Sequence, residues 1–216
     1  MRLTSIAALG IISVAMLAGC AATTPSQPVK AEPATTSSPL PTPTIDPGPV
    51  TLTTDEASDR YLGIVCQRNG VIAQMNEAFS VQEETYLNSG EADASAVKVA
   101  AIEVLRVNSM QIALFDDPYY TWPEGLIVHL KNIRDASMTQ SSMFDSIANA
   151  SSYEAAYYMT APETPEATTS AQEIRYQLQL SPDTTASCQG YETATDTLHA
   201  EMLERTEYLA TFAEED

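Results

Sequence analysis

The chain has 216 residues, of which 29 are acidic and 10 basic, so its formal net charge is −19 at pH 7. Such an acidic surface repels nucleic acid and anionic lipid headgroups, which argues against DNA, RNA or peripheral membrane binding. Cationic partners, such as divalent ions or basic peptides, are compatible with this charge, although solubility alone also explains it.

Residues 1–20 have the layout of a secretory signal. Arg2 precedes an apolar run at residues 6–17, which is too short to span a bilayer. The run closes on the sequence LAGC at residues 17–20, which resembles the lipobox of bacterial lipoproteins. The resemblance implies that residues 1–19 are removed and that Cys20 carries lipid, including acyl chains such as palmitate. The protein would then be anchored to the extracytoplasmic face of the cell membrane. The alternative is an ordinary secreted protein with a chance cysteine at the cleavage site.

Residues 20–51 are rich in Pro, Ser, Thr and Ala and almost lack large apolar side chains. They cannot bury enough surface to offset the cost of ordering, so they are predicted to form a disordered tether. In extended polyproline II form the tether would reach about 90 Å. It is similar to tethers on lipoproteins of Gram-positive bacteria, particularly actinobacteria. Residues 52–216 are the predicted extracytoplasmic domain, similar to helical domains of small actinobacterial lipoproteins that have no assigned activity.

The chain has 3 cysteines, and lipidation of Cys20 leaves Cys66 and Cys188. Exported thiols tend to become disulfides, so these two are predicted to pair and to join the two ends of the domain. The alternative is a catalytic thiol at Cys66 with His129 or His199 as its base. A nucleophilic cysteine needs a lowered pKa from a base or a helix N-terminus, whereas Cys66 lies about three turns inside a predicted helix.

Apolar spacing predicts helices throughout the domain. A capping box of Thr53 and Glu56 opens a helix over residues 54–87. A second helix follows Asp93, its predicted N-cap, and ends before Pro118. The predicted buried face of this second helix consists of Ala96, Val99, Ile102, Leu105, Ile112 and Phe115.

The remaining helices are marked by their start signals. Thr121 and Glu124 predict a capping box for a third helix that continues to Ser151. A new start at residues 151–154, a helix from residue 164 to Pro182 and a C-terminal helix beyond Cys188 complete the set. No segment alternates convincingly with a period of two residues. The predicted fold is therefore all-α, a bundle of about four long helices plus shorter ones, with one disulfide.

Recognisable catalytic and metal-binding motifs are absent from the sequence, and it has only 2 histidines. One loop is a candidate ligand site, because aromatic rings beside carboxylates suit a sugar or a cationic ligand. Its residues are Asp116, Asp117, Tyr119, Tyr120 and Trp122. The alternative is structural, with Trp122 and one tyrosine capping the bundle and the aspartates in solvent.

Two further clusters have simple structural explanations. Glu192, Asp196 and His199 resemble a loose divalent-metal site, but this pattern is more often plain surface, so no metal or other cofactor is predicted. Three tyrosines, together with Met159, could line a pocket or simply pack: Tyr153, Tyr157 and Tyr158.

The sequence therefore favours a membrane-anchored lipoprotein without enzymatic activity, acting as a binding or accessory module at the cell envelope. Its expected partners are the membrane, through the lipid anchor, and a protein or small ligand at the cell surface, with no nucleic acid. The alternative is a hydrolase or wall-processing enzyme that uses paired carboxylates.

Overall fold

The computed structural model describes residues 48–213, and Cys20 and the tether up to residue 47 lie outside them. The described elements are, in chain order, β1 (Val50–Thr51), α1 (Thr54–Ser89), α2 (Ser95–Phe115), β2 (Tyr120–Thr121), η1 (Glu124–Leu126), α3 (Ile127–Ala148), α4 (Tyr153–Tyr157), α5 (Pro165–Gln177), α6 (Thr184–Ser187) and α7 (Ala194–Ala213).

Helix α1 begins at the predicted capping box. The Thr53 hydroxyl accepts the Glu56 N–H at 3.3 Å, and the Glu56 carboxylate accepts the Thr53 N–H at 2.8 Å. The helix ends at Gly90, whose φ of 75° is in the left-handed region and whose N–H donates to the Tyr86 carbonyl at 2.7 Å. The local signals therefore gave the start of α1 correctly and its end within two residues.

Helix α2 buries a different face from the predicted one. Val99 and Ile102 are 67% and 57% exposed, whereas Val97 and Val104 are fully enclosed. The helix has apolar residues on most of its sides, and its buried face also includes the polar Asn108. Its N-cap is Ala94, although the Asp93 carboxylate accepts the Ser95 N–H nearby at 3.0 Å.

The start of α3 also differs from the prediction. Thr121 belongs to β2, so it does not cap the helix, and Glu124 opens the short helix η1. The helix ends at Ala148, short of Ser151, because the Ser152 hydroxyl already accepts the Ala155 N–H and starts α4.

The two short strands are a feature that the sequence did not predict. β1 and β2 pair in parallel, with the Val50 N–H donating to the Tyr119 carbonyl at 2.7 Å and the Leu52 N–H to the Thr121 carbonyl at 2.9 Å. Val50 and Thr51 lie in the segment 20–51, which the composition predicts to be the tether. Gly48 precedes them with a φ of 69°, and a Cβ there would lie 2.7 Å from the Tyr119 ring.

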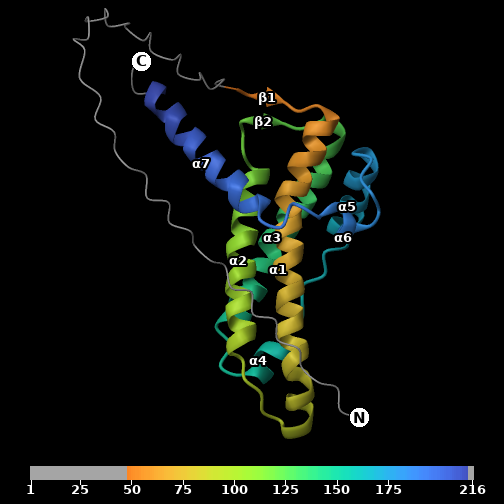
Figure 1. Cartoon of the computed structure of the whole chain (residues 1–216), viewed down its shortest axis with the longest axis vertical. Helices are drawn as coiled ribbons and strands as arrows, with labels where there is room; N and C mark the ends of the chain where they lie inside the picture. The colour runs from red at the N-terminus through yellow and green to blue at the C-terminus, as the bar shows by residue number, and fades with distance from the viewer. Residues whose placement is uncertain (1–47, 214–216) are drawn as a thin grey trace, which may run out of the picture. The chain divides into compact units, whose positions relative to one another are not determined.

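Helices α1, α2 and α3 pack side by side, with α4 against their lower end in Figure 1. Helix α7 packs on α1 and α2 at the opposite end, and α5 packs on α3. Two apolar clusters fill the bundle: one surrounds Val104, Phe144 and Tyr153, and the other surrounds Leu114, Leu126 and Ile174. The predicted all-α bundle is confirmed.

None of the helices between residues 48 and 213 combines the length and the apolar character that a bilayer span requires.

Candidate functional site

The loop after α2 is held to the rest of the domain by a buried carboxylate. The Asp117 side chain is only 3% exposed and accepts the Arg60 guanidinium at 2.9 Å and the Arg205 guanidinium at 2.6 Å. It also accepts the Tyr119 N–H at 3.1 Å. Because Arg60 lies on α1 and Arg205 on α7, Asp117 joins both helices to the loop.

The aromatic rings of this loop are covered by the same guanidinium groups. Arg60 stacks over Tyr120 at 3.7 Å from the ring centre, and Arg205 over Tyr119 at 4.1 Å. Trp122 lies in the apolar cluster around Leu114. Burial lowers the pKa of Arg60, and the nearby negative charge of Asp117 opposes this effect.

Asp116 is the exposed member of the loop. Its carboxylate is 49% exposed and accepts the Arg134 guanidinium of α3 at 2.7 Å. All five candidate residues of this loop therefore have partners within the domain. Ligand binding by the loop stays a prediction, and these contacts give its side chains a structural role as well.

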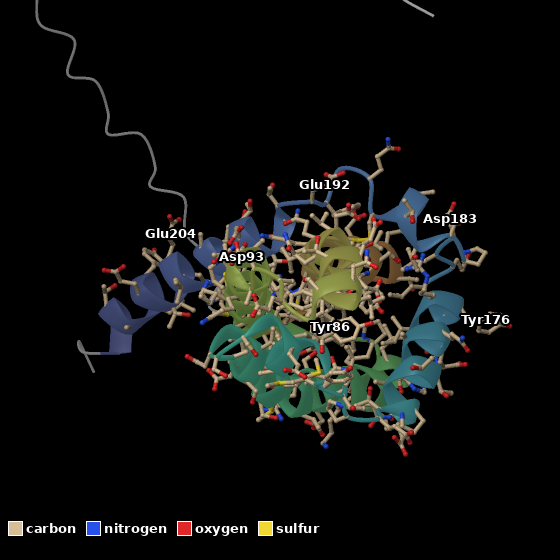
Figure 2. All side chains as sticks on the ribbon, turned by 90° about the horizontal axis from the view of Figure 1, so that it is seen from below. Tyr86, Asp93, Tyr176, Asp183, Glu192 and Glu204 are labelled. Atoms are coloured by element: carbon tan, nitrogen blue, oxygen red, sulfur yellow. A yellow bond between two sulfur atoms is a disulfide. The ribbon has the colours of Figure 1, made fainter. Side chains whose placement is uncertain are left out.

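Cys66 and Cys188 form the predicted disulfide, with Cα atoms 5.2 Å apart. Cys66 is buried in α1, and Cys188 ends the short helix α6. The bond holds the segment between α5 and α7 against α1, and the competing role of Cys66 as a free nucleophile does not apply. Figure 2 shows Asp183 and Glu192, near the two ends of this segment, at the outer edge of the domain.

Beside the disulfide, a groove of about 1350 Å³ is lined by α1, α2, α3, α5, the segment that contains α6 and the start of α7. Its walls carry amide, hydroxyl and guanidinium groups from residues far apart in the sequence. Those that matter most for its chemistry are Arg68, Gln74, Gln111, Gln140, Thr168 and Arg175.

Arg68 is the cation in the middle part of α1. Its Nε donates to the Asn108 side-chain oxygen at 2.7 Å, and its Nη2 donates to the Gln140 side-chain oxygen at 2.6 Å. Both acceptors are neutral amides. Burial without a compensating charge lowers the pKa of Arg68 to about 10.

Arg175 is a second guanidinium in the groove wall, near the end of α5. It donates to the Ser181 carbonyl and, at 2.5 Å, to the Ser187 hydroxyl, so it fastens the segment around α6. Burial raises the pKa of the Tyr61 phenol to about 12, and the nearby positive charge of Arg175 opposes this rise.

The acidic groups at one end of the groove are held by ion pairs. Asp196 and Glu103 both accept hydrogen bonds from Arg106. The Gln67 amide donates to Asp196 at 2.5 Å, and these contacts, led by the Arg106 bond, lower the pKa of Asp196. Between residues 48 and 213 no group of three or more His, Cys, Asp or Glu is placed to hold a metal ion.

The tyrosines near α4 pack as a cluster. Tyr153 is buried, and its hydroxyl donates to the Phe79 carbonyl at 2.8 Å. Tyr157 donates to the Glu83 carboxylate at 2.6 Å, and this hydrogen bond is the main reason that the pKa of Tyr157 is raised. Tyr86 contacts the rings of Tyr153 and Tyr157, so these rings fill the core of that end.

A second concavity of about 590 Å³ lies between β1, α1 and the start of α7. Its lining is mostly apolar and includes Leu52 and Leu198. Its one basic side chain among the described residues is Arg60, which is already bound to Asp117. This concavity therefore offers fewer orienting groups than the groove beside the disulfide.

The sequence did not single out Arg68, Gln140 or Arg175. Each lies alone among residues of other types, and only the packing of α1, α3 and α5 brings them to one groove. The available signal was the position of Arg68, seven residues after Tyr61 and therefore on the same side of α1 as that buried ring.

The chain matches no protein-family model, no curated protein and no solved structure, so its chemistry has to be argued from these contacts.

Proposed function

We propose that the protein is a lipid-anchored, extracytoplasmic binding module without enzymatic activity, whose ligand occupies the groove beside the Cys66–Cys188 disulfide. The lipobox resemblance of residues 17–20 and the composition of residues 20–51 support the anchor and the tether. The domain would then be held away from the membrane, where it meets ligands of the cell envelope.

The observation that carries the binding role is the groove itself. Its volume of about 1350 Å³ exceeds that of typical small-molecule sites, and helices from distant parts of the chain present polar groups along it. The loop at residues 116–124, in contrast, uses its carboxylates and rings for contacts within the domain.

The contacts of Asp196 in the groove argue against this residue as the general acid of a carboxylate-based hydrolase. General acid catalysis needs a carboxyl group whose pKa is raised towards neutrality. Asp196 has the opposite perturbation, because Arg106 and Gln67 stabilise its ionised form.

The anchor is tested by metabolic labelling with a fatty-acid probe. Wild-type protein should be labelled and Cys20→Ala should not, because the acyl chains attach at that residue. Equal labelling of the two proteins would contradict lipidation at Cys20.

The groove is tested with a bulky residue on its wall. Ala73 is exposed and lines the groove, so Ala73→Trp should fill part of it without disturbing the core. Ala200→Trp on the exposed side of α7 is the matched control. Fractions of an envelope extract are added to each protein, and the thermal midpoint is measured.

At least one fraction should raise the midpoint of the wild type and of Ala200→Trp, and have little effect on Ala73→Trp. A rise of the same size in all three proteins, or no rise with any fraction, would refute the groove as the binding site.

A further inference from the structure

Few of the cations between residues 48 and 213 lack an acidic partner. Among residues 48–213, five of the lysine and arginine side chains form ion pairs: Arg60, Arg106, Lys131, Arg134 and Arg205. The described cations outside these pairs are Arg68, Lys98 and Arg175. Two of these three line the same groove. Although the whole chain has 29 acids and 10 bases, these two guanidinium groups have no ion pair among the described residues, whereas Arg106 in the same lining does.

Arg68 has the most unusual surroundings of these cations. An arginine cannot give up its charge at neutral pH, so burial has to be offset by an anion or by hydrogen bonds. The neutral amides of Asn108 and Gln140 supply hydrogen bonds but no opposite charge. Burial is also the single perturbation of its pKa, with no carboxylate acting on it.

The Arg68 guanidinium still has donors to offer. Its bonds to Asn108 and Gln140 use Nε and Nη2. Nη1 makes no hydrogen bond within the described residues and is not one of their buried unpartnered atoms, so it is open to solvent. A guanidinium with free N–H groups matches a carboxylate or phosphate through paired, charge-assisted hydrogen bonds. Arg68 can therefore take an anion that enters from the groove as a further partner.

The rest of the groove distinguishes between these anions. Asp196 and Glu103 share the single guanidinium of Arg106, so this end of the groove keeps one net negative charge, which repels a dianion more than a monoanion. Arg175 already uses its donors on the Ser181 carbonyl and the Ser187 hydroxyl, so Arg68 is the one guanidinium left for a ligand, and a single carboxylate matches its charge. The geometry thus favours a monocarboxylate over a phosphate.

The other polar groups of the groove suit a peptide. The side-chain oxygen of Gln111 is buried without a hydrogen-bond partner, while its nitrogen donates to Ser137 at 3.2 Å. An N–H donor from a ligand would satisfy that oxygen. Gln74 and Thr168 are exposed residues of the lining and can pair with further amides.

We infer that the groove binds the free carboxyl end of a short peptide, with Arg68 as the counter-ion of the carboxylate and Gln111 and its neighbours as partners of the peptide amides. This inference rests on the proposed function, because it names the ligand class of the same groove.

The test uses a pool of acetylated tripeptides in two forms, with a free carboxylate and with a carboxamide at the end. Each pool is passed over immobilised domain, and retention is read by mass spectrometry. The wild type should retain the free acids at least about tenfold more strongly than the amides, because an amide cannot replace the charge that meets Arg68.

Arg68→Met removes the guanidinium and keeps an unbranched side chain in the helix. It should lower the retention of the free acids by about tenfold or more and leave the amides unchanged. Lys98→Met is the matched control, because Lys98 has no ion pair among the described residues and lies outside the groove lining. Circular dichroism of each variant reports whether the helices are intact.

The comparison of acid with amide on the wild type does not depend on the folding of any variant. Equal retention of the two forms, no retention of either, or free acids held by Arg68→Met as by the wild type would overturn the inference. Stronger competition by inorganic phosphate than by acetate would also overturn it. If peptides are retained by the wild type and lost in Ala73→Trp, but without preference for the free carboxylate, the inference fails and the proposed groove stands.

Discussion

Replacement of Asp117 by asparagine tests whether the buried carboxylate holds the loop, α1 and α7 together. Asparagine has nearly the same shape, so the change removes the charge without leaving a cavity. Arg60 and Arg205 would then share a site in which neither guanidinium has an anion. Loss of one partner from a buried ion pair costs about 3–5 kcal/mol. For a domain of this size that corresponds to a fall in Tm of roughly 10 °C.

The assay is thermal and urea unfolding of the domain, followed by circular dichroism. Asp116→Asn is the matched control, because that carboxylate is 49% exposed and its pairing with Arg134 is screened by solvent. It should change the free energy of unfolding by less than about 1 kcal/mol. Equal effects of the two substitutions, or an effect of Asp117→Asn below 1 kcal/mol, would refute the reasoning.

Three further predictions follow from other contacts. Reduction of the Cys66–Cys188 disulfide, whose cysteines are separated by 122 positions, should lower the free energy of unfolding by up to about 5 kcal/mol, measured by urea unfolding. The helices should be retained at neutral pH. Burial raises the pKa of Tyr61 to about 12, so the folded state holds this proton more tightly than the unfolded state does. The free energy of unfolding should therefore fall by about 3 kcal/mol as the pH rises from 10 through 12. Urea unfolding across this pH range should show that Tyr61→Phe lacks the decrease due to this phenol. Limited proteolysis should release a stable fragment that begins near residues 45–55, because β1 starts at Val50, and N-terminal sequencing of a fragment cut inside α1 would contradict this.

Local signals in the sequence were sufficient where a helix end is determined by its own residues. The capping box at Thr53 and Glu56 depends on side chains three positions apart, so its geometry is independent of the rest of the fold. The same holds for Pro165, which occupies the first turn of α5, at the predicted start of that helix. The disulfide was predictable for another reason, since the cysteine count left a single pairing.

The buried face of α2 was not predictable from periodicity. Apolar residues lie on most sides of this helix, and the side against α3 is fixed by polar contacts: the Asn108 amide donates to the Ser137 carbonyl at 2.7 Å. A sequence pattern counts such an asparagine as surface, because its partner lies 29 residues away on another helix.

The groove was missed for a related reason. Arg68, Gln140 and Arg175 come from three helices, and apart from the spacing of Arg68 from Tyr61, their local sequence does not distinguish them from solvent-exposed residues. The loop at residues 116–124 was predicted as a ligand site because its acidic and aromatic residues are neighbours in the chain. In the fold, Arg60 and Arg205, which are distant in the sequence, bind Asp117 and cover the two tyrosine rings, and Arg134 binds Asp116.

The two apolar clusters lie along the same three long helices, and this has a consequence for how the domain opens. Val71 on α1 belongs to one cluster and Tyr61 to the other, and α2 contributes Val104 and Leu114 in the same way. Neither cluster can separate without breaking these helices in the middle. Backbone amides in the central turns of α1 and α2 should therefore exchange with deuterium only when the entire domain unfolds, while those of α4 exchange through brief local openings.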